Sequence, residues 1–119
     1  MTDEQSAQRV VVETLRRLPL ELKSAAEEVP VCFEGWPSDE LMDDGLDPDV
    51  LGLFVGAPRH QHHGDPGPPP QIILYLENIL RECEEAGTNF EEEVRRTYLH
   101  ELGHYLGLDE EDLAARDLD

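Results

Sequence analysis

Residues 97–113 read TYLHELGHYLGLDEEDL, and this stretch decides how the C-terminal part of the chain folds. Upstream of it, Thr88-Asn89 followed by Glu91 and Glu92 is typical of a helix N-cap with a capping-box acid. Gly107 stands where a helix end favours a residue that tolerates positive φ. Between these signals the apolar residues recur at helical spacing: Val94, Tyr98, Leu99, Leu102, Tyr105 and Leu106. The pattern predicts a helix from Phe90 to Gly107 with one face in the core.

Two histidines lie one helical turn apart within this segment. His100 and His104 are in positions i and i+4 of an H-E-x-x-H motif, which places both on the same face of a helix. Two imidazoles in this arrangement can reach one Zn²⁺ at about 2.0–2.1 Å. Glu101 projects about 100° around the axis, beside the metal, where it can take a proton from a water on the zinc. The motif therefore predicts a Lewis acid, a nucleophilic water and a general base.

A catalytic zinc needs a third protein ligand and an open position for water. Gly107 would let the chain reverse, so that Glu110 folds back toward the two histidines. Asp109 is an alternative third ligand, and a residue elsewhere in the chain is another. Residues 109–112 also have the acidic pattern of an N-cap and first turn of a short helix running toward Leu118.

The stretch 97–113 resembles the small bacterial zincin-like metallopeptidases, whose last helix carries H-E-x-G-H-x-x-G-x-x-acid. Residues 51–56 (LGLFVG) and 72–76 (IILYL) are similar to two strands of that family, and the resemblance covers roughly residues 30–115. It implies zinc held by His100, His104 and Glu110, with Glu101 as the base. Members more usually carry Asp at the last position, where this chain has Glu.

The segment order predicts an α+β fold, a minimal zincin-like domain with a small sheet of about three strands and helices packed on it. We expect residues 1–119 to form one domain. Residues 3–28 are amphipathic and helical, with a bend or break at Pro19. Residues 38–49 are an acidic loop or short helical turn, and 57–70 a Pro-, Gly- and His-rich loop or lid. The expected strands are Val29–Trp36, Leu51–Val55 and Gln71–Leu76, and the expected helix before the motif is Glu77–Glu85, ended by Gly87.

The composition excludes some partners. The formal net charge is −19, whereas nucleic-acid binding requires a basic face. The same charge argues against anionic membrane surfaces. Cys32 and Cys83 form no C-x-x-C motif, so a thiolate zinc site is not indicated. No export signal or membrane span is recognisable, so we expect a cytoplasmic protein with reduced thiols.

Three further histidines lie in the Pro-rich loop. His60, His62 and His63 favour a solvated loop, with a second metal site or a lid that supplies a catalytic histidine as alternatives. Their role stays open at the level of the sequence.

The function predicted from these residues is zinc-dependent peptide hydrolysis. An extended peptide substrate would add to a sheet edge above the zinc helix, along residues 53–55 or 72–76. Gly103 and Gly107 are candidates for a close strand approach, or are simply packing and turn residues. The alternatives are a zinc-binding interaction or regulatory protein without proteolysis, and an acidic domain in which the motif is accidental.

Overall fold

The computed structural model describes residues 1–59 and 68–118, and a three-stranded sheet organises them. The strands are β1 (Val31–Glu34), β2 (Gly52–Val55) and β3 (Gln71–Tyr75). β3 lies in the middle, parallel to β1 and antiparallel to β2. β3 carries the buried Ile-Ile-Leu-Tyr run, as expected for a strand with neighbours on both sides. The predicted α+β class and strand number are confirmed.

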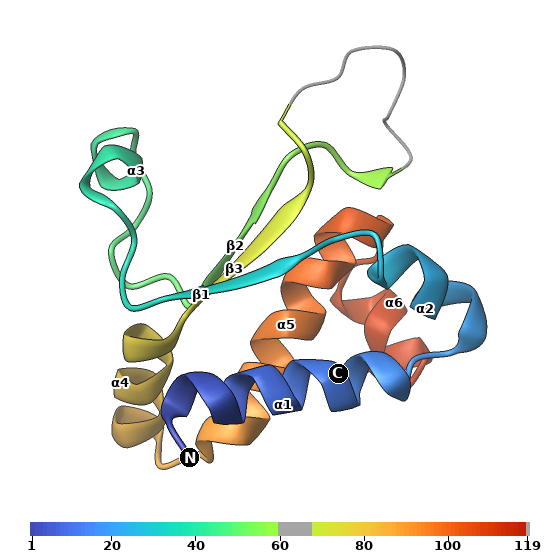
Figure 1. The fold of residues 1–119 in the computed structure, drawn as a ribbon, viewed down its shortest axis with the longest axis horizontal. Coiled ribbons are helices and arrows are strands. Elements are labelled where there is room, and N and C mark those ends of the chain that lie inside the picture. The colour runs from blue at the N-terminus through green and yellow to red at the C-terminus, as the bar shows by residue number, and fades with distance from the viewer. Residues whose placement is uncertain (60–67, 119) are drawn as a thin grey trace.

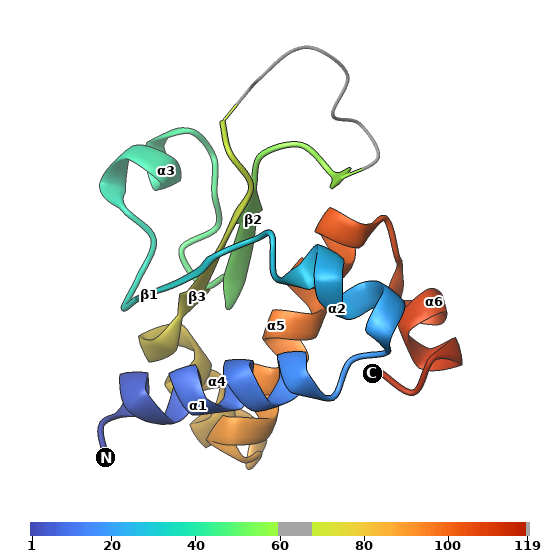
Figure 2. The same ribbon diagram turned by 45° about the vertical axis from the view of Figure 1, so that its right-hand side comes forward.

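The helices of the described chain are α1 (Asp3–Arg16), α2 (Leu20–Ala26), α3 (Asp39–Asp43), α4 (Leu76–Ala86), α5 (Phe90–Leu106) and α6 (Glu110–Ala115). Figures 1 and 2 show α1, α4 and α5 on one side of the sheet, with α6 beside the C-terminal end of α5. α5 packs against α1, α2, α4, α6 and two strands, so it is the central helix of the fold.

The apolar stripe of α5 is the centre of the core. Its residues Val94, Tyr98 and Leu102 are at most 1% exposed, and they pack with Ile72 and Leu74 of β3. Burying an aliphatic or aromatic side chain of this size stabilises the fold by about 1.5–3 kcal/mol. The helical stripe predicted from the sequence is therefore confirmed.

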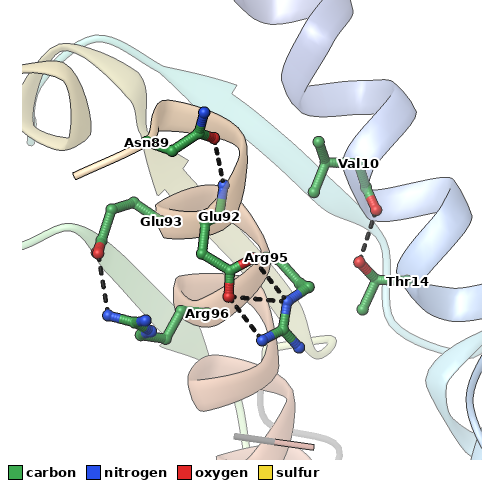
Figure 3. Close-up of polar contacts among 7 residues, drawn as sticks. All are labelled: Val10, Thr14, Asn89, Glu92, Glu93, Arg95 and Arg96. Carbon is green, nitrogen blue, oxygen red and sulfur yellow. Dashed lines mark hydrogen bonds and ion pairs between the residues drawn. The ribbon is translucent and has the colours of Figure 1, made fainter. Parts of the chain in front are cut away.

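Local signals fix both ends of α5. The Asn89 side chain accepts a hydrogen bond of 3.1 Å from the backbone N–H of Glu92 (Figure 3). Only this hydrogen bond of the predicted capping box forms. The Glu92 carboxylate, which would form the second one, accepts hydrogen bonds from Arg95 instead. At the other end, Gly107 has a φ of 73° and its N–H donates to the carbonyl of Gly103.

Pro19 divides the N-terminal helical segment as predicted. α1 ends at Arg16 and α2 begins at Leu20, with Pro19 as its N-cap. Proline suits this position because it has no N–H to donate to a preceding turn.

All three strands are shorter than the sequence predicted, and β2 begins at Gly52 instead of Leu51. The strand predicted over Val29–Trp36 was too long, because β1 pairs with β3 only from Val31 to Glu34. Pro30 precedes it, and Trp36 is 57% exposed. At the end of β3, Leu76 is already the first residue of α4, so this strand is one residue shorter than predicted. α4 is longer than predicted by one residue at each end, because it runs from Leu76 to Ala86.

The remaining segments agree with the sequence where they are described. The acidic segment 38–49 contains the short helix α3, and Gly87 ends α4 with a φ of 69°. The cysteines are free, with Cys32 on β1 and Cys83 on α4. Most of the predicted loop, including His60, His62 and His63, lies outside the described residues. None of the helices in the described ranges is long and apolar enough to cross a bilayer.

Tyr98 has a buried hydroxyl with no hydrogen-bond partner among the described residues. We expect Tyr98→Phe to raise the free energy of unfolding by about 1 kcal/mol at pH 7, because it removes an unsatisfied polar group. Burial also raises the pKa of Tyr98 to about 12, whereas tyrosine in an unfolded chain ionises near pH 10. The native protein should therefore lose stability as the pH rises from about 10 to 12, and the variant should lose less. Urea unfolding at pH 7 and pH 11 measures both effects.

Tyr105→Phe is the matched control. The Tyr105 hydroxyl donates a hydrogen bond of 2.7 Å to Glu28, so its removal should destabilise the fold. Equal changes in the free energy of unfolding in Tyr98→Phe and Tyr105→Phe would contradict the conclusion that the Tyr98 hydroxyl is unsatisfied.

Candidate active site

The two motif histidines converge on the exposed face of α5. Their Nε2 atoms are 3.4 Å apart, and the His100 side chain is 48% exposed. Two ligands at 2.0–2.1 Å from a tetrahedral zinc ion are separated by about 3.4 Å. The imidazole pair therefore fits the spacing that zinc requires.

Glu101 lies on the side of the same helix turn that faces the sheet. The residue is only 8% exposed. Burial raises the pKa of its carboxyl group, while the neighbouring His104 and His100 and a backbone hydrogen bond from Phe54 act in the opposite direction. A raised pKa gives this carboxylate a greater proton affinity, which suits a general base near neutral pH.

The edge strand β2 passes directly over Glu101. A Cβ atom placed on Gly52 would lie 2.9 Å from Cγ2 of Thr97 and 3.1 Å from Cγ of Glu101. Further along the strand, the Phe54 ring packs on Tyr105 with 5.8 Å between the ring centroids. β3 is central, so of the two strands predicted as a substrate edge only β2, with residues 53–55, lies at an edge of the described sheet; β1 forms the other edge.

Glu110 comes close to the histidine pair, on a different side of His100 from His104. Its Oε1 atom is 3.5 Å from Nδ1 of His100, and its side chain is 83% exposed. Asp109 is occupied elsewhere, because its carboxylate accepts a hydrogen bond of 2.8 Å from the backbone N–H of Asp112 and caps α6. The chain reversal after Gly107 thus brings Glu110 to His100, whereas the Asp109 carboxylate caps α6.

The described residues contain no group of three or more His, Cys, Asp and Glu side chains arranged to hold a metal ion. The structure brings together His100 and His104 as one pair of donors, and His100 and Glu110 as another. The ligand roles of His100, His104 and Glu110 and the base role of Glu101 remain predictions.

Gly103 allows the returning chain, and not a strand, to approach α5. A Cβ atom here would lie 2.8 Å from the carbonyl oxygen of Leu108, and the Leu108 N–H donates to the Gly103 carbonyl over 2.8 Å. The strand approaches the helix through Gly52 instead. The alternative reading of Gly103 and Gly107 as packing and turn residues is therefore the correct one.

A polar contact holds the C-terminal end of α5 to the preceding segments. Tyr105 donates to Glu28, which also accepts from Nε of Arg59 at 3.1 Å. Glu28 follows α2 and Arg59 follows β2, so the contact joins three segments next to His104. Its members are far apart along the chain, so no local pattern in the sequence indicates this contact.

The fold is zincin-like. Its central helix carries two histidines one turn apart and a buried glutamate, and it lies beneath the edge strand of a small mixed sheet. A sequence model of the zincin-like metallopeptidases matches residues 26–119, which is more than half of the chain. The chain therefore belongs to the zincin-like metallopeptidase family. No curated protein shows a significant match to it.

Gly52→Ala tests the close packing of β2 on α5. We expect the variant to lose about 1–3 kcal/mol of stability, because the added methyl group overlaps Thr97 and the Ile73 carbonyl oxygen is only 3.2 Å from its position. Thermal or urea unfolding measures the change. The double variant Gly52→Ala/Thr97→Ser lacks Cγ2 of Thr97, the atom closest to the added methyl group, and should recover part of the lost stability. No loss in Gly52→Ala would mean that β2 does not lie this close to the helix.

Gly52 is a residue that sequence reasoning passed over. A glycine inside a strand pattern often marks a site where another backbone or side chain approaches closely. That signal was present in residues 51–56, but it does not say which helix lies below the strand.

Proposed function

We propose that this protein is a zinc-dependent peptidase in which His100 and His104 bind the metal and Glu101 is the general base. The single observation that carries the proposal is the 3.4 Å separation of the two Nε2 atoms beside a buried carboxylate. Membership of the zincin-like metallopeptidase family supports the same reaction class. Glu110 is the third donor that we propose, because it follows the turn at Gly107 and its carboxylate is exposed. The carboxylate lies 3.5 Å from Nδ1 of His100, on the other side of the ring from the Nε2 pair, so it would have to turn to bind the same ion.

Each residue has a separate part in the hydrolysis. When bound, zinc would polarise the scissile carbonyl and lower the pKa of a coordinated water toward about 7. Glu101 accepts the proton of the attacking water and passes it to the leaving amine. The hydrogen bond from Phe54 orients the carboxylate for both transfers.

The outer edge of β2 is the proposed substrate edge. β2 is paired only with β3 in the described sheet and runs over Glu101. An extended peptide would add there through main-chain hydrogen bonds, with its scissile bond above the histidine pair. We propose peptides or proteins as the substrates, and the net charge of −19 disfavours nucleic acid and anionic membranes as partners.

Metal removal and reconstitution test the proposal. A peptide library should be cleaved by the zinc-loaded protein, left intact after chelation and dialysis, and cleaved again after one equivalent of zinc is added. Mass spectrometry of the products identifies the cleaved bonds. Cleavage that persists in metal-free protein would overturn the zinc mechanism.

A zinc-binding protein without proteolysis is the second candidate. The observation that favours it is the imidazole pair, whose 3.4 Å spacing suits a zinc ion and does not by itself require hydrolysis. In that case the protein would bind about one zinc per chain, and the library would remain intact with and without metal.

A further inference from the structure

A hollow of about 570 Å³ lies between α5 and α6, next to the candidate metal centre. His100 and Glu110 are part of its wall, so it opens directly beside the histidine pair. Its volume is within the range of about 300–1,000 Å³ typical of ligand pockets. The described residues of its wall lie on α5, on α6 and at Leu118, and none is on β2, so a substrate bound along β2 would reach the hollow across His100.

The floor of the hollow is apolar. Leu99 of α5 and Leu113 of α6 are 2% and 6% exposed, and Leu118 packs partly buried against the core beside them. These side chains would bury the methylene groups of a long substrate side chain. The charged head of such a side chain would have to remain at the rim.

The rim carries two carboxylates and one guanidinium group, so its net charge is negative. Glu110 and Glu111, in the first turn of α6, are both exposed and belong to the wall. Arg96 also borders the hollow, but its Nη1 donates a hydrogen bond of 3.1 Å to the largely buried Glu93 (Figure 3). If Glu110 binds zinc, Glu111 still supplies a negative charge at the opening.

We propose that this hollow is a specificity pocket for an arginine or lysine side chain of the substrate. The inference rests on the proposed peptidase function and adds a substrate class to it. The apolar floor accepts the stem of the basic side chain, and Glu111 attracts its cation. Glu111 is thus a specificity-determining residue, outside the catalytic group.

Direct binding tests the pocket without turnover. Fluorescein-labelled octapeptides of glycine and alanine, each with a single Arg, citrulline or Glu, would be titrated into the Glu101→Gln protein with and without added zinc. Citrulline keeps the shape of arginine but has no charge. We expect the Arg peptide to bind about five-fold more tightly than the citrulline peptide, and the Glu peptide to bind weakest. Fluorescence anisotropy gives the dissociation constants.

Two variants of the pocket separate charge from shape. Glu111→Lys should abolish the preference for Arg over citrulline, whereas Glu40→Lys on α3 changes the net charge equally and should preserve it. Ala114→Phe places a large side chain in the hollow and should weaken both peptides by at least about ten-fold. Equal binding of the Arg and citrulline peptides would overturn the proposal, as would an equal effect of the two lysine variants.

The outcome is independent of the peptidase assay. If the native protein cleaves nothing while the Arg preference and its loss in Glu111→Lys are observed, the pocket stands and the proposed hydrolysis falls. If the native protein cleaves peptides with no preference for basic residues, the hydrolysis stands and the pocket falls.

Discussion

Glu101→Gln should reduce peptide hydrolysis by about 10²–10⁴-fold and leave the zinc content at about one ion per chain. The substitution keeps the size and hydrogen-bonding character of a side chain that is only 8% exposed, so the packing under β2 is retained. It removes the carboxylate that we propose accepts the proton of the attacking water. The readouts are kcat/KM on a peptide from the library and zinc content by inductively coupled plasma mass spectrometry.

Glu91→Gln is the control on the same helix. Glu91 lies in the first turn of α5 and contacts Arg9 at the surface, far along the helix from the histidines. This variant should retain both zinc and activity. Full activity in Glu101→Gln would remove Glu101 from the mechanism, and loss of zinc in that variant would make it a ligand or a structural residue.

His104→Ala should lower the affinity for zinc by more than about 100-fold. Substitution of groups that only orient a ligand typically costs 10–100-fold, and this change removes a proposed ligand itself. His104 is exposed, so the fold should remain intact. Competition with a chromophoric chelator gives the affinity, and circular dichroism checks the fold. Unchanged affinity would mean that the imidazole pair is not the metal site.

A second pair of variants identifies the third ligand. Glu110→Gln should weaken zinc binding, since an amide oxygen is a poorer donor than a carboxylate. Asp109→Asn should leave it unchanged, because Asp109 caps α6 and asparagine caps a helix equally well. The reverse result would move the third ligand from Glu110 to Asp109.

The family resemblance drawn from residues 97–113 agrees with the family match over residues 26–119. That agreement has a local cause, because the identifying residues are contiguous on one helix and the turn that follows it. Strand ends were predicted less well. β1 is shorter than its apolar run because only four of its residues find partners in β3.

The sequence by itself determined α5, an N-cap at Thr88 or Asn89, its end at Gly107 and the placement of His100 and His104 on one face. All of these depend on interactions within a few residues along the chain. Only the tertiary structure decided that β2 is the edge strand over Glu101, that Gly52 is the point of closest approach, and that a hollow opens between α5 and α6. These features arise from contacts between segments far apart in sequence, and neither hydrophobic periodicity nor turn signals specify which segments will meet.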